Sequence, residues 1–216
     1  VTALGQSIYP RWGVFAPTRH EYLDLVMQAP LREHWRYGAD VGTGTGVLAM
    51  LLANRGLNVV ASDTNAAARD CAVDNATRLG LSSRIQVVAE DLIPSGQFDL
   101  LVCNPPWLPG HASGQLEAAV YDPGHQMLKG FLKTATGHLK PGGQAWLILS
   151  DLAEHLHLRS HEQLLHWIDE AGLAVANRLD AKPTHGKRLN QQDPLWQPRQ
   201  AEVTSLWLLC SSDETP

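Results

Sequence analysis

The segment from Asp40 to Leu52, DVGTGTGVLAMLL, constrains the fold of this chain more than any other part. The apolar run Tyr37 to Val41 can form a buried strand. The glycines Gly42, Gly44 and Gly46 then allow the backbone to turn sharply and to lie close to a ligand. The residues that follow are apolar at helical spacing, so a helix is expected to begin at once with its N-terminus at the ligand. This order predicts a cradle for a nucleotide-type ligand.

An acidic residue at the end of the next predicted strand supports this interpretation. The run Val59 to Ser62 ends in Asp63, about 20 residues after Gly42, where a carboxylate can accept hydrogen bonds from both hydroxyls of a ribose. An isolated Gly-x-Gly can equally be an ordinary turn between a strand and a helix, and Asp63 makes that alternative weaker. These features fit a site for NAD as well as a site for S-adenosylmethionine.

The glycine spacing and a second motif separate these two ligands. The dinucleotide fingerprint is Gly-x-Gly-x-x-Gly, whereas here the third glycine comes one residue early, giving Asp-x-Gly-x-Gly-x-Gly from Asp40 to Gly46. The apolar run Phe98 to Cys103 is followed directly by Asn-Pro-Pro-Trp at 104–107. With these two segments the sequence resembles the class I S-adenosylmethionine-dependent methyltransferases. The tetrapeptide is similar to the (Asn/Asp)-Pro-Pro-aromatic motif of members that methylate planar nitrogens, either exocyclic amines of bases or the side-chain amide of glutamine.

The resemblance implies a set of cofactor-binding residues. Asp63 would bind the ribose, and Asp91, after the predicted strand Ile85 to Ala89, would accept from the adenine amino group. The alternative for Asp91 is a solvated acid at a strand end. Residues 13–19 are similar to the segment that precedes the first strand in related methyltransferases, which would place Thr18 near the cofactor, although a capping or packing role is the favoured alternative. The predicted cofactor-binding residues are Thr18, Asp40, Gly42, Gly44, Gly46, Asp63, Asp91 and Asn104.

The Asn-Pro-Pro-Trp segment is predicted to carry the chemistry. An amide or aniline-like nitrogen is a poor nucleophile because its lone pair is delocalised. Asn104 Oδ1 and the Pro105 carbonyl can accept both N–H bonds of the target NH₂ group and direct its lone pair at the methyl group. Pro105 and Pro106 keep that carbonyl rigid, and Trp107 offers an aromatic face to a planar substrate. No metal is predicted, because no cysteine or placed carboxylate completes a site with His157 and His161.

Composition limits the other functions that the chain could have. At 216 residues, with 44% hydrophobic and 18% charged residues, it is expected to form one globular domain. The net charge of −5 gives no general attraction to phosphate, so a nucleic-acid partner would need a local basic patch. Cys71, Cys103 and Cys210 are far apart, which favours a reducing cytoplasm over a disulfide framework. No leader and no apolar run of about 18 residues is present, so no membrane contact is predicted.

Strands alternating with helices predict an α/β fold of Rossmann-like type, with a mostly parallel sheet and helices on both faces. Residues 1–36 are predicted to form a lead-in segment and a helix, and residues 37–216 the methyltransferase domain. The resemblance implies a seven-stranded sheet of order 3-2-1-4-5-7-6 with strand seven antiparallel. Apolar spacing predicts that Val73 and Leu165 face the core, and Pro141 to Gly143 predicts a tight turn.

The leading hypothesis is an S-adenosylmethionine-dependent N-methyltransferase acting on a protein glutamine, on an exocyclic amine in RNA or DNA, or on a small metabolite. The acidic net charge and the similarity of Glu117 to Phe131 to glutamine methyltransferases favour glutamine, whereas tryptophan rather than tyrosine at Trp107 weakens that choice. The alternatives are a non-catalytic cofactor-binding subunit and an NAD-dependent oxidoreductase.

The length of chain before the first predicted strand bears on substrate recognition. Related methyltransferases often carry a substrate-recognition domain in front of the methyltransferase domain, whereas here only residues 1–36 precede that strand, and the sequence begins at Val1 rather than Met. We therefore expect the chain to bind cofactor well but to methylate poorly unless a missing N-terminal recognition domain is joined to it.

Overall fold

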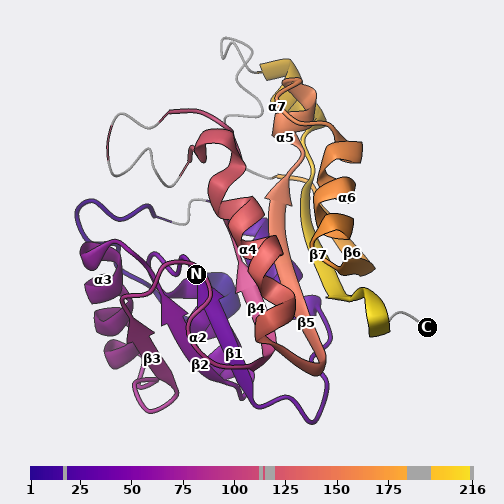
Figure 1. Ribbon diagram of the computed structural model, residues 1–216. Helices are drawn as coiled ribbons and strands as arrows, with labels where there is room; N and C mark the ends of the chain where they lie inside the picture. Colours follow the sequence, from indigo (N-terminus) through magenta and orange to yellow (C-terminus); the bar gives the residue numbers. More distant parts are fainter. Residues whose placement is uncertain (17–18, 112–113, 115–119, 184–195, 215–216) are drawn as a thin grey trace.

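A seven-stranded sheet lies at the centre of the described part of the molecule (Figure 1). The computed structural model describes residues 1–16, 19–111, 114, 120–183 and 196–214. The strand order is β3-β2-β1-β4-β5-β7-β6, which confirms the order expected from the resemblance. The strands are β1 Tyr37–Val41, β2 Asn58–Ser62, β3 Ile85–Val88, β4 Phe98–Cys103, β5 Leu139–Ser150, β6 Leu173–Ala181 and β7 Thr204–Ser211.

The sheet is parallel from β3 to β5 and antiparallel at its other end. All neighbouring pairs among β1 to β5 run parallel, whereas β7 runs antiparallel to both β5 and β6. The predicted reversal of the last strand is therefore confirmed. Because the carboxyl ends of β1, β2, β4 and β5 meet at one edge, that edge is where a fold of this kind binds ligands.

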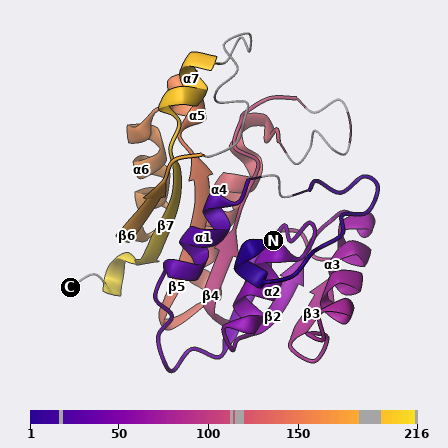
Figure 2. The same ribbon diagram turned by 180° about the vertical axis from the view of Figure 1, so that it is seen from behind.

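Helices cover both faces of the sheet, as predicted. One face carries α4 and α6 (Figure 1), and the opposite face carries α1, α2 and α3 (Figure 2). Among the residues described, no helix combines the length and apolarity that crossing a membrane requires. The helices are α1 Glu21–Gln28, α2 Val47–Asn54, α3 Ala66–Arg78, α4 Gln126–His138, α5 Leu152–His155, α6 His161–Glu170 and α7 Trp196–Ala201, with short 3-10 turns η1 Thr2–Leu4, η3 Pro123–His125 and η5 Ser212–Glu214.

The central strands are apolar on both sides because each side packs against helices. In β4, Leu100 and Val102 contribute to the cluster beneath α1 and α2, whereas Leu101 and Cys103 contribute to the cluster beneath α4 and α6. This alternation follows from the two-residue period of a strand. The apolar run of residues 98–103 is what a strand buried on both faces requires.

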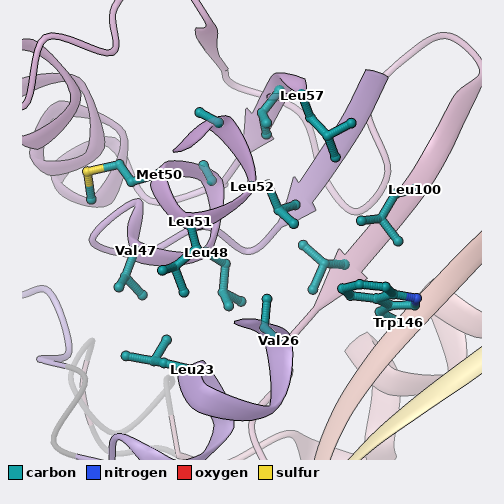
Figure 3. Packing of buried hydrophobic residues seen from close by; sticks show 14 of the residues in the cluster. Leu23, Val26, Val47, Leu48, Met50, Leu51, Leu52, Leu57, Leu100 and Trp146 are labelled. Atoms are coloured by element: carbon teal, nitrogen blue, oxygen red, sulfur yellow. The ribbon is translucent and has the colours of Figure 1, made fainter. Parts of the chain in front are cut away.

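Helix α2 is buried on all sides rather than on one face. Every residue from Val47 to Ala53 is buried, because α1 and η1 cover the side that turns away from the sheet. Leu23 and Val26 of α1 point toward α2 and Trp146 of β5 (Figure 3). The N-terminal residues 1–36 thus pack on the same core as the strands that follow.

Two predicted core residues lie on the surface. The side chain of Val73 in α3 is 48% exposed and that of Leu165 in α6 is 39% exposed, so both predictions were wrong. In α3 the buried side is formed by small residues such as Cys71 and Ala72, and in α6 by Leu164 and Ile168. The reason is helical phase, since a residue about 100° away from the buried stripe turns to solvent even when it is apolar.

The predicted turn at Pro141 to Gly143 is a bulge within β5 instead. Leu139 pairs with Phe98 and Gln144 with Leu100, so β5 has extra residues opposite Asp99. A Cβ on Gly143 would lie 3.0 Å from the Asp99 carbonyl oxygen and 3.1 Å from that of Phe98. Glycine is therefore required here by close contact between two backbones, and the strand continues through the bulge.

Candidate active site

The register of the sheet places three predicted residues side by side. Val41, the last residue of β1, pairs with Ser62 of β2 on one side and with Cys103 of β4 on the other. The next residue of each strand is Gly42, Asp63 or Asn104. Neighbouring strands are about 4.8 Å apart, so Asp63 and Asn104 follow strands roughly 10 Å from each other with the glycine loop between them.

The glycine loop after β1 is held by the end of β2. The backbone N–H groups of Gly42 and Thr43 both donate to the Ser62 carbonyl oxygen at 2.9 Å. Gly42, Gly44 and Gly46 have φ angles of +71°, +55° and +81°. These left-handed conformations are ones that glycine adopts without strain, so the loop depends on the spacing that the sequence shows.

The three glycines meet different surroundings. A Cβ on Gly44 would have no heavy atom within 4 Å, so the space beside this residue is open. A Cβ on Gly46 would lie 3.1 Å from Ala72 of α3, and one on Gly42 would lie 2.4 Å from the Cε atom of Met127 in α4. Gly44 is therefore the position that leaves room for a ligand. At Gly46 the α3 backbone lies too close for a side chain, whereas at Gly42 the end of the Met127 side chain would have to move. Met127 was not predicted to lie at this site.

Asp40 supports the glycine loop from below. Its buried Oδ2 accepts hydrogen bonds from Thr43 Oγ1 at 2.6 Å and from the Ala49 backbone N–H at 3.0 Å. The second bond caps α2, which Gly46 at the N-cap position cannot do without a side chain. Asp40 Oδ1 has no partner among the described residues. Burial, with a smaller contribution from the nearby charge of Asp63, raises the pKa of Asp40 to about 6 although these hydrogen bonds lower it.

The raised pKa of Asp40 predicts a pH-dependent stability that Asp40→Asn should remove. Because the folded pKa of about 6 lies above the ordinary value of 3.8, protonation of Asp40 stabilises the fold fully below about pH 4. This contribution is lost as the pH rises through 6, and a difference of this size corresponds to about 3 kcal/mol. Urea unfolding of both proteins between pH 4 and pH 7 should show the variant gaining stability relative to the parent as the pH rises. A difference that stays constant with pH would contradict the assignment.

Asp63 is held beside the loop by two backbone groups. Its Oδ2 accepts from the Gly44 N–H at 3.0 Å, and its Oδ1 accepts from the Asn65 N–H at 2.8 Å. Each carboxylate oxygen can accept a further hydrogen bond, so both remain available to a ligand. The Asp63 carboxylate is therefore fixed beside the open space at Gly44.

Asp91 lies in the turn after β3 and is exposed. No hydrogen bond of its side chain is found within the described residues. The adjacent Leu92 has a φ of +58°, and its carbonyl oxygen accepts from Ser62 Oγ at 2.6 Å, which ties this turn to the end of β2. Asp91 is thus placed near the same edge, and its contact with a ligand stays a prediction. Thr18 lies outside the described residues.

Asn104 is fixed by a hydrogen bond that the sequence did not indicate. The half-buried Asn104 accepts at Oδ1 from the indole Nε1–H of Trp107 at 2.9 Å. The guanidinium carbon of Arg19 lies 4.5 Å from the centroid of the Trp107 ring. Just beyond, the Leu108 carbonyl oxygen accepts from the Asp122 N–H at 2.8 Å. The Asn-Pro-Pro-Trp segment is thus held at both of its ends.

Comparison with known proteins identifies the family. The sequence model described as "Methyltransferase small domain" matches residues 7–165, which is most of the chain. The chain belongs to the methyltransferase small domain family. This confirms the methyltransferase family that the sequence resembles.

Curated relatives that the chain resembles include proteins named for methylation of glutamine and of adenine. A release factor glutamine methyltransferase of Moorella thermoacetica is 33% identical over 150 residues, which is 59% of the chain and 53% of the relative. A tRNA1(Val) (adenine(37)-N6)-methyltransferase of Pedobacter heparinus is 33% identical over 121 residues, 51% of the chain and 50% of the relative. A release factor glutamine methyltransferase of Chlorobaculum tepidum is 43% identical over 95 residues, 39% of the chain and 32% of the relative. The chain thus spans between about a third and a half of these relatives.

Solved structures of methyltransferases share the fold. The ribosomal protein L11 methylase of Lactobacillus delbrueckii subsp. bulgaricus has a TM-score of 0.59 at 18% identity, over 87% of the chain and 76% of the neighbour. A methyltransferase of Thiobacillus denitrificans in complex with S-adenosyl-L-homocysteine has a TM-score of 0.54 at 15% identity, over 91% of the chain and 92% of the neighbour. At these identities the likeness shows the fold alone.

The residues at the edge fit S-adenosylmethionine. The open space beside Gly44 admits a ligand close to the backbone. The Asp63 carboxylate suits the hydroxyl groups of a ribose. The buried Asp40 Oδ1, which has no partner among the described residues, leaves negative charge beneath the loop for a cationic ligand. These are the residues that would hold the cofactor. They come from the ends of β1 and β2 and from the loop between β1 and α2.

The open space at Gly44 predicts a selective effect of Gly44→Ala. A matched control is Gly80→Ala, because Gly80 also has a positive φ, +70°, and open space around it, but follows α3 away from the site. Both variants should lose about 1–2 kcal/mol of stability through left-handed strain. Only Gly44→Ala should weaken binding of S-adenosylhomocysteine, by roughly tenfold, because its methyl group enters the ligand space. Equal affinities of the two variants in calorimetry would show that Gly44 serves the loop alone.

Proposed function

We propose that this chain catalyses S-adenosylmethionine-dependent methylation of a planar nitrogen, either the side-chain amide of a protein glutamine or the exocyclic amine of a nucleobase. The observation that carries the proposal is the position of Asn104, directly after β4 and next to the glycine loop in the register of the sheet. Relatives named for methylation of glutamine and of adenine support it. Both reactions modify an NH₂ group on a planar, conjugated centre.

Asn104 and Pro105 would bind the target NH₂ group. When bound, S-adenosylmethionine supplies a methyl group that is activated by the sulfonium charge. Asn104 Oδ1 would accept one N–H of the acceptor and the Pro105 carbonyl oxygen the other, so that the nitrogen lone pair turns out of conjugation. No hydrogen bond to that carbonyl is found within the described residues. The two prolines limit the conformations of this segment, which orients both acceptors before the substrate binds.

The assignment of cofactor contacts is also a proposal. Asp63 would accept hydrogen bonds from the ribose hydroxyls, and Asp91 would accept from the adenine amino group. Gly44 would let the ligand approach the loop. The other predicted cofactor-binding residues, retained with these three, are Thr18, Asp40, Gly42 and Gly46, whereas Asn104 is proposed to contact the methyl acceptor instead.

The methyl acceptor is proposed to be a protein or a nucleic acid. The chain should be incubated with S-adenosylmethionine that carries a radiolabelled methyl group and with a cell extract. The expected result is label in the macromolecular fraction, removed either by protease or by nuclease. A chain that binds the cofactor but transfers no label, even when it is joined to an N-terminal recognition domain, would be the non-catalytic subunit instead. The cytoplasm is retained as the proposed location, supported by Cys71, Cys103 and Cys210, which are all buried thiols without a disulfide.

A further inference from the structure

We propose that Trp107 is a positioning residue whose indole N–H orients the Asn104 side-chain amide, and that Arg19 holds Trp107 in place. This inference rests on the proposed function, because the oriented amide is the acceptor for the target nitrogen. It gives Trp107 a role other than stacking on the substrate. It also gives a role to Arg19, which lies outside both sequence motifs.

The chemistry of the two side chains allows only one orientation of the amide. The indole Nε1–H is a donor and cannot accept, whereas the asparagine amide has one accepting and one donating end. With Trp107 Nε1 at 2.9 Å from Asn104 Oδ1, a flipped amide would place its NH₂ group against the indole N–H. The amide oxygen has a second lone pair. That lone pair remains for a substrate N–H, so the contact fixes the acceptor without consuming it.

The indole ring of Trp107 is itself fixed by a contact with Arg19. The Arg19 guanidinium carbon lies 4.5 Å from the centroid of the Trp107 ring, within the range of a cation–π contact. The half-buried ring also packs against residues of both core clusters. Because Arg19 covers the ring, the position of the indole N–H is set by the protein before any substrate binds.

Arg19 is anchored by hydrogen bonds from all three of its nitrogens. Nε donates to Glu21 Oε1 at 2.6 Å, Nη1 to Glu202 Oε1 at 2.6 Å and Nη2 to Thr204 Oγ1 at 2.9 Å. Glu202 is fully buried and also accepts from Ser150 Oγ. Burial alone would raise the pKa of Glu21, but the charge of Arg19 and hydrogen bonds outweigh it and lower that pKa. The start of α1, the end of β5 and the start of β7 are thereby joined behind Trp107.

Trp107→Phe tests this role because it keeps an aromatic ring and removes the N–H donor together with the five-membered part of the indole. Loss of one neutral hydrogen bond should lower the single-turnover rate of methyl transfer by roughly 3- to 10-fold. The affinity for S-adenosylhomocysteine and the KM for the extract fraction that accepts the label should change little, whereas the smaller ring should lower the thermal transition. Trp12→Phe is the matched control, because Trp12 is 95% exposed and should leave all four quantities unchanged.

Repeating Trp107→Phe in the Asn104→Asp variant separates an orienting role of Trp107 from a structural one. In Asn104→Asp both carboxylate oxygens accept, so there is no wrong orientation for Trp107 to prevent. Adding Trp107→Phe to Asn104→Asp should therefore lower the rate less than twofold. An equal loss in both backgrounds, or a rate increase in Trp107→Phe alone, would overturn this role for Trp107 and leave the proposed function standing. Absence of label transfer by the parent would overturn the proposed function and this role with it.

Discussion

Replacing Asn104 by alanine should lower the single-turnover rate of methyl transfer by roughly 10²–10³-fold while leaving cofactor affinity nearly unchanged. Asn104 follows β4, on the opposite side of the glycine loop from Asp63. Its amide oxygen is therefore proposed to contact the methyl acceptor rather than the adenosine. The hydrogen bond that it accepts should strengthen as the target nitrogen turns tetrahedral, so its loss raises the barrier more than it weakens binding.

The measurement compares the parent, Asn104→Ala and Asn104→Asp in single-turnover methylation and in calorimetry with S-adenosylhomocysteine. Asn104→Asp should retain more activity than Asn104→Ala, because its carboxylate still accepts from the amino group and from the Trp107 indole N–H. If Asn104→Ala loses rate and cofactor affinity in equal proportion, Asn104 is a cofactor ligand or a turn residue. In that case the mechanism proposed for this site fails.

Asp63→Ala should weaken binding of S-adenosylhomocysteine by about 2–3 kcal/mol, or roughly 30- to 150-fold. Two effects contribute to this loss. The carboxylate is the proposed acceptor for the ribose hydroxyls, and it also accepts from the Gly44 N–H at 3.0 Å, so its removal loosens the glycine loop as well. Asp63→Asn keeps one accepting oxygen and loses the charge, and it should fall between the parent and the alanine variant.

A surface aspartate provides the control for Asp63. Asp24 lies on the exposed side of α1, and Asp24→Ala should leave the affinity for S-adenosylhomocysteine unchanged. Titration calorimetry on the three variants and the parent gives the comparison directly. An affinity of Asp63→Ala within twofold of the parent would remove Asp63 from the cofactor site.

The part of the fold near the glycine loop could be predicted because its signals are local. The strands β1 and β4 have the bounds that their apolar runs indicated, and Asn65 caps α3 through its side chain as its residue type favours. The fold then follows, since alternating strands and helices leave few arrangements. The same topology brings Gly42, Asp63 and Asn104 to one edge.

The contacts that orient the site could not be predicted, because they join residues far apart in the sequence. Arg19 is bound to Glu202 and Thr204 from the other end of the chain. Met127 reaches Gly42 from α4, which depends on how that helix is placed on the sheet. The Trp107–Asn104 hydrogen bond spans three residues, but it depends on a backbone turn that residue types alone do not specify.

The chemical identity of the methylated atom tests the central claim most directly. Material labelled by the parent chain in a cell extract should be digested completely, and the modified residue or nucleoside identified by mass spectrometry. The account predicts a methyl group on a planar nitrogen, as the methylated side-chain amide of glutamine or a methylated exocyclic amine, and none when Asn104→Ala replaces the parent. A methyl group on a carboxylate oxygen, a thiol or a ring carbon would contradict it.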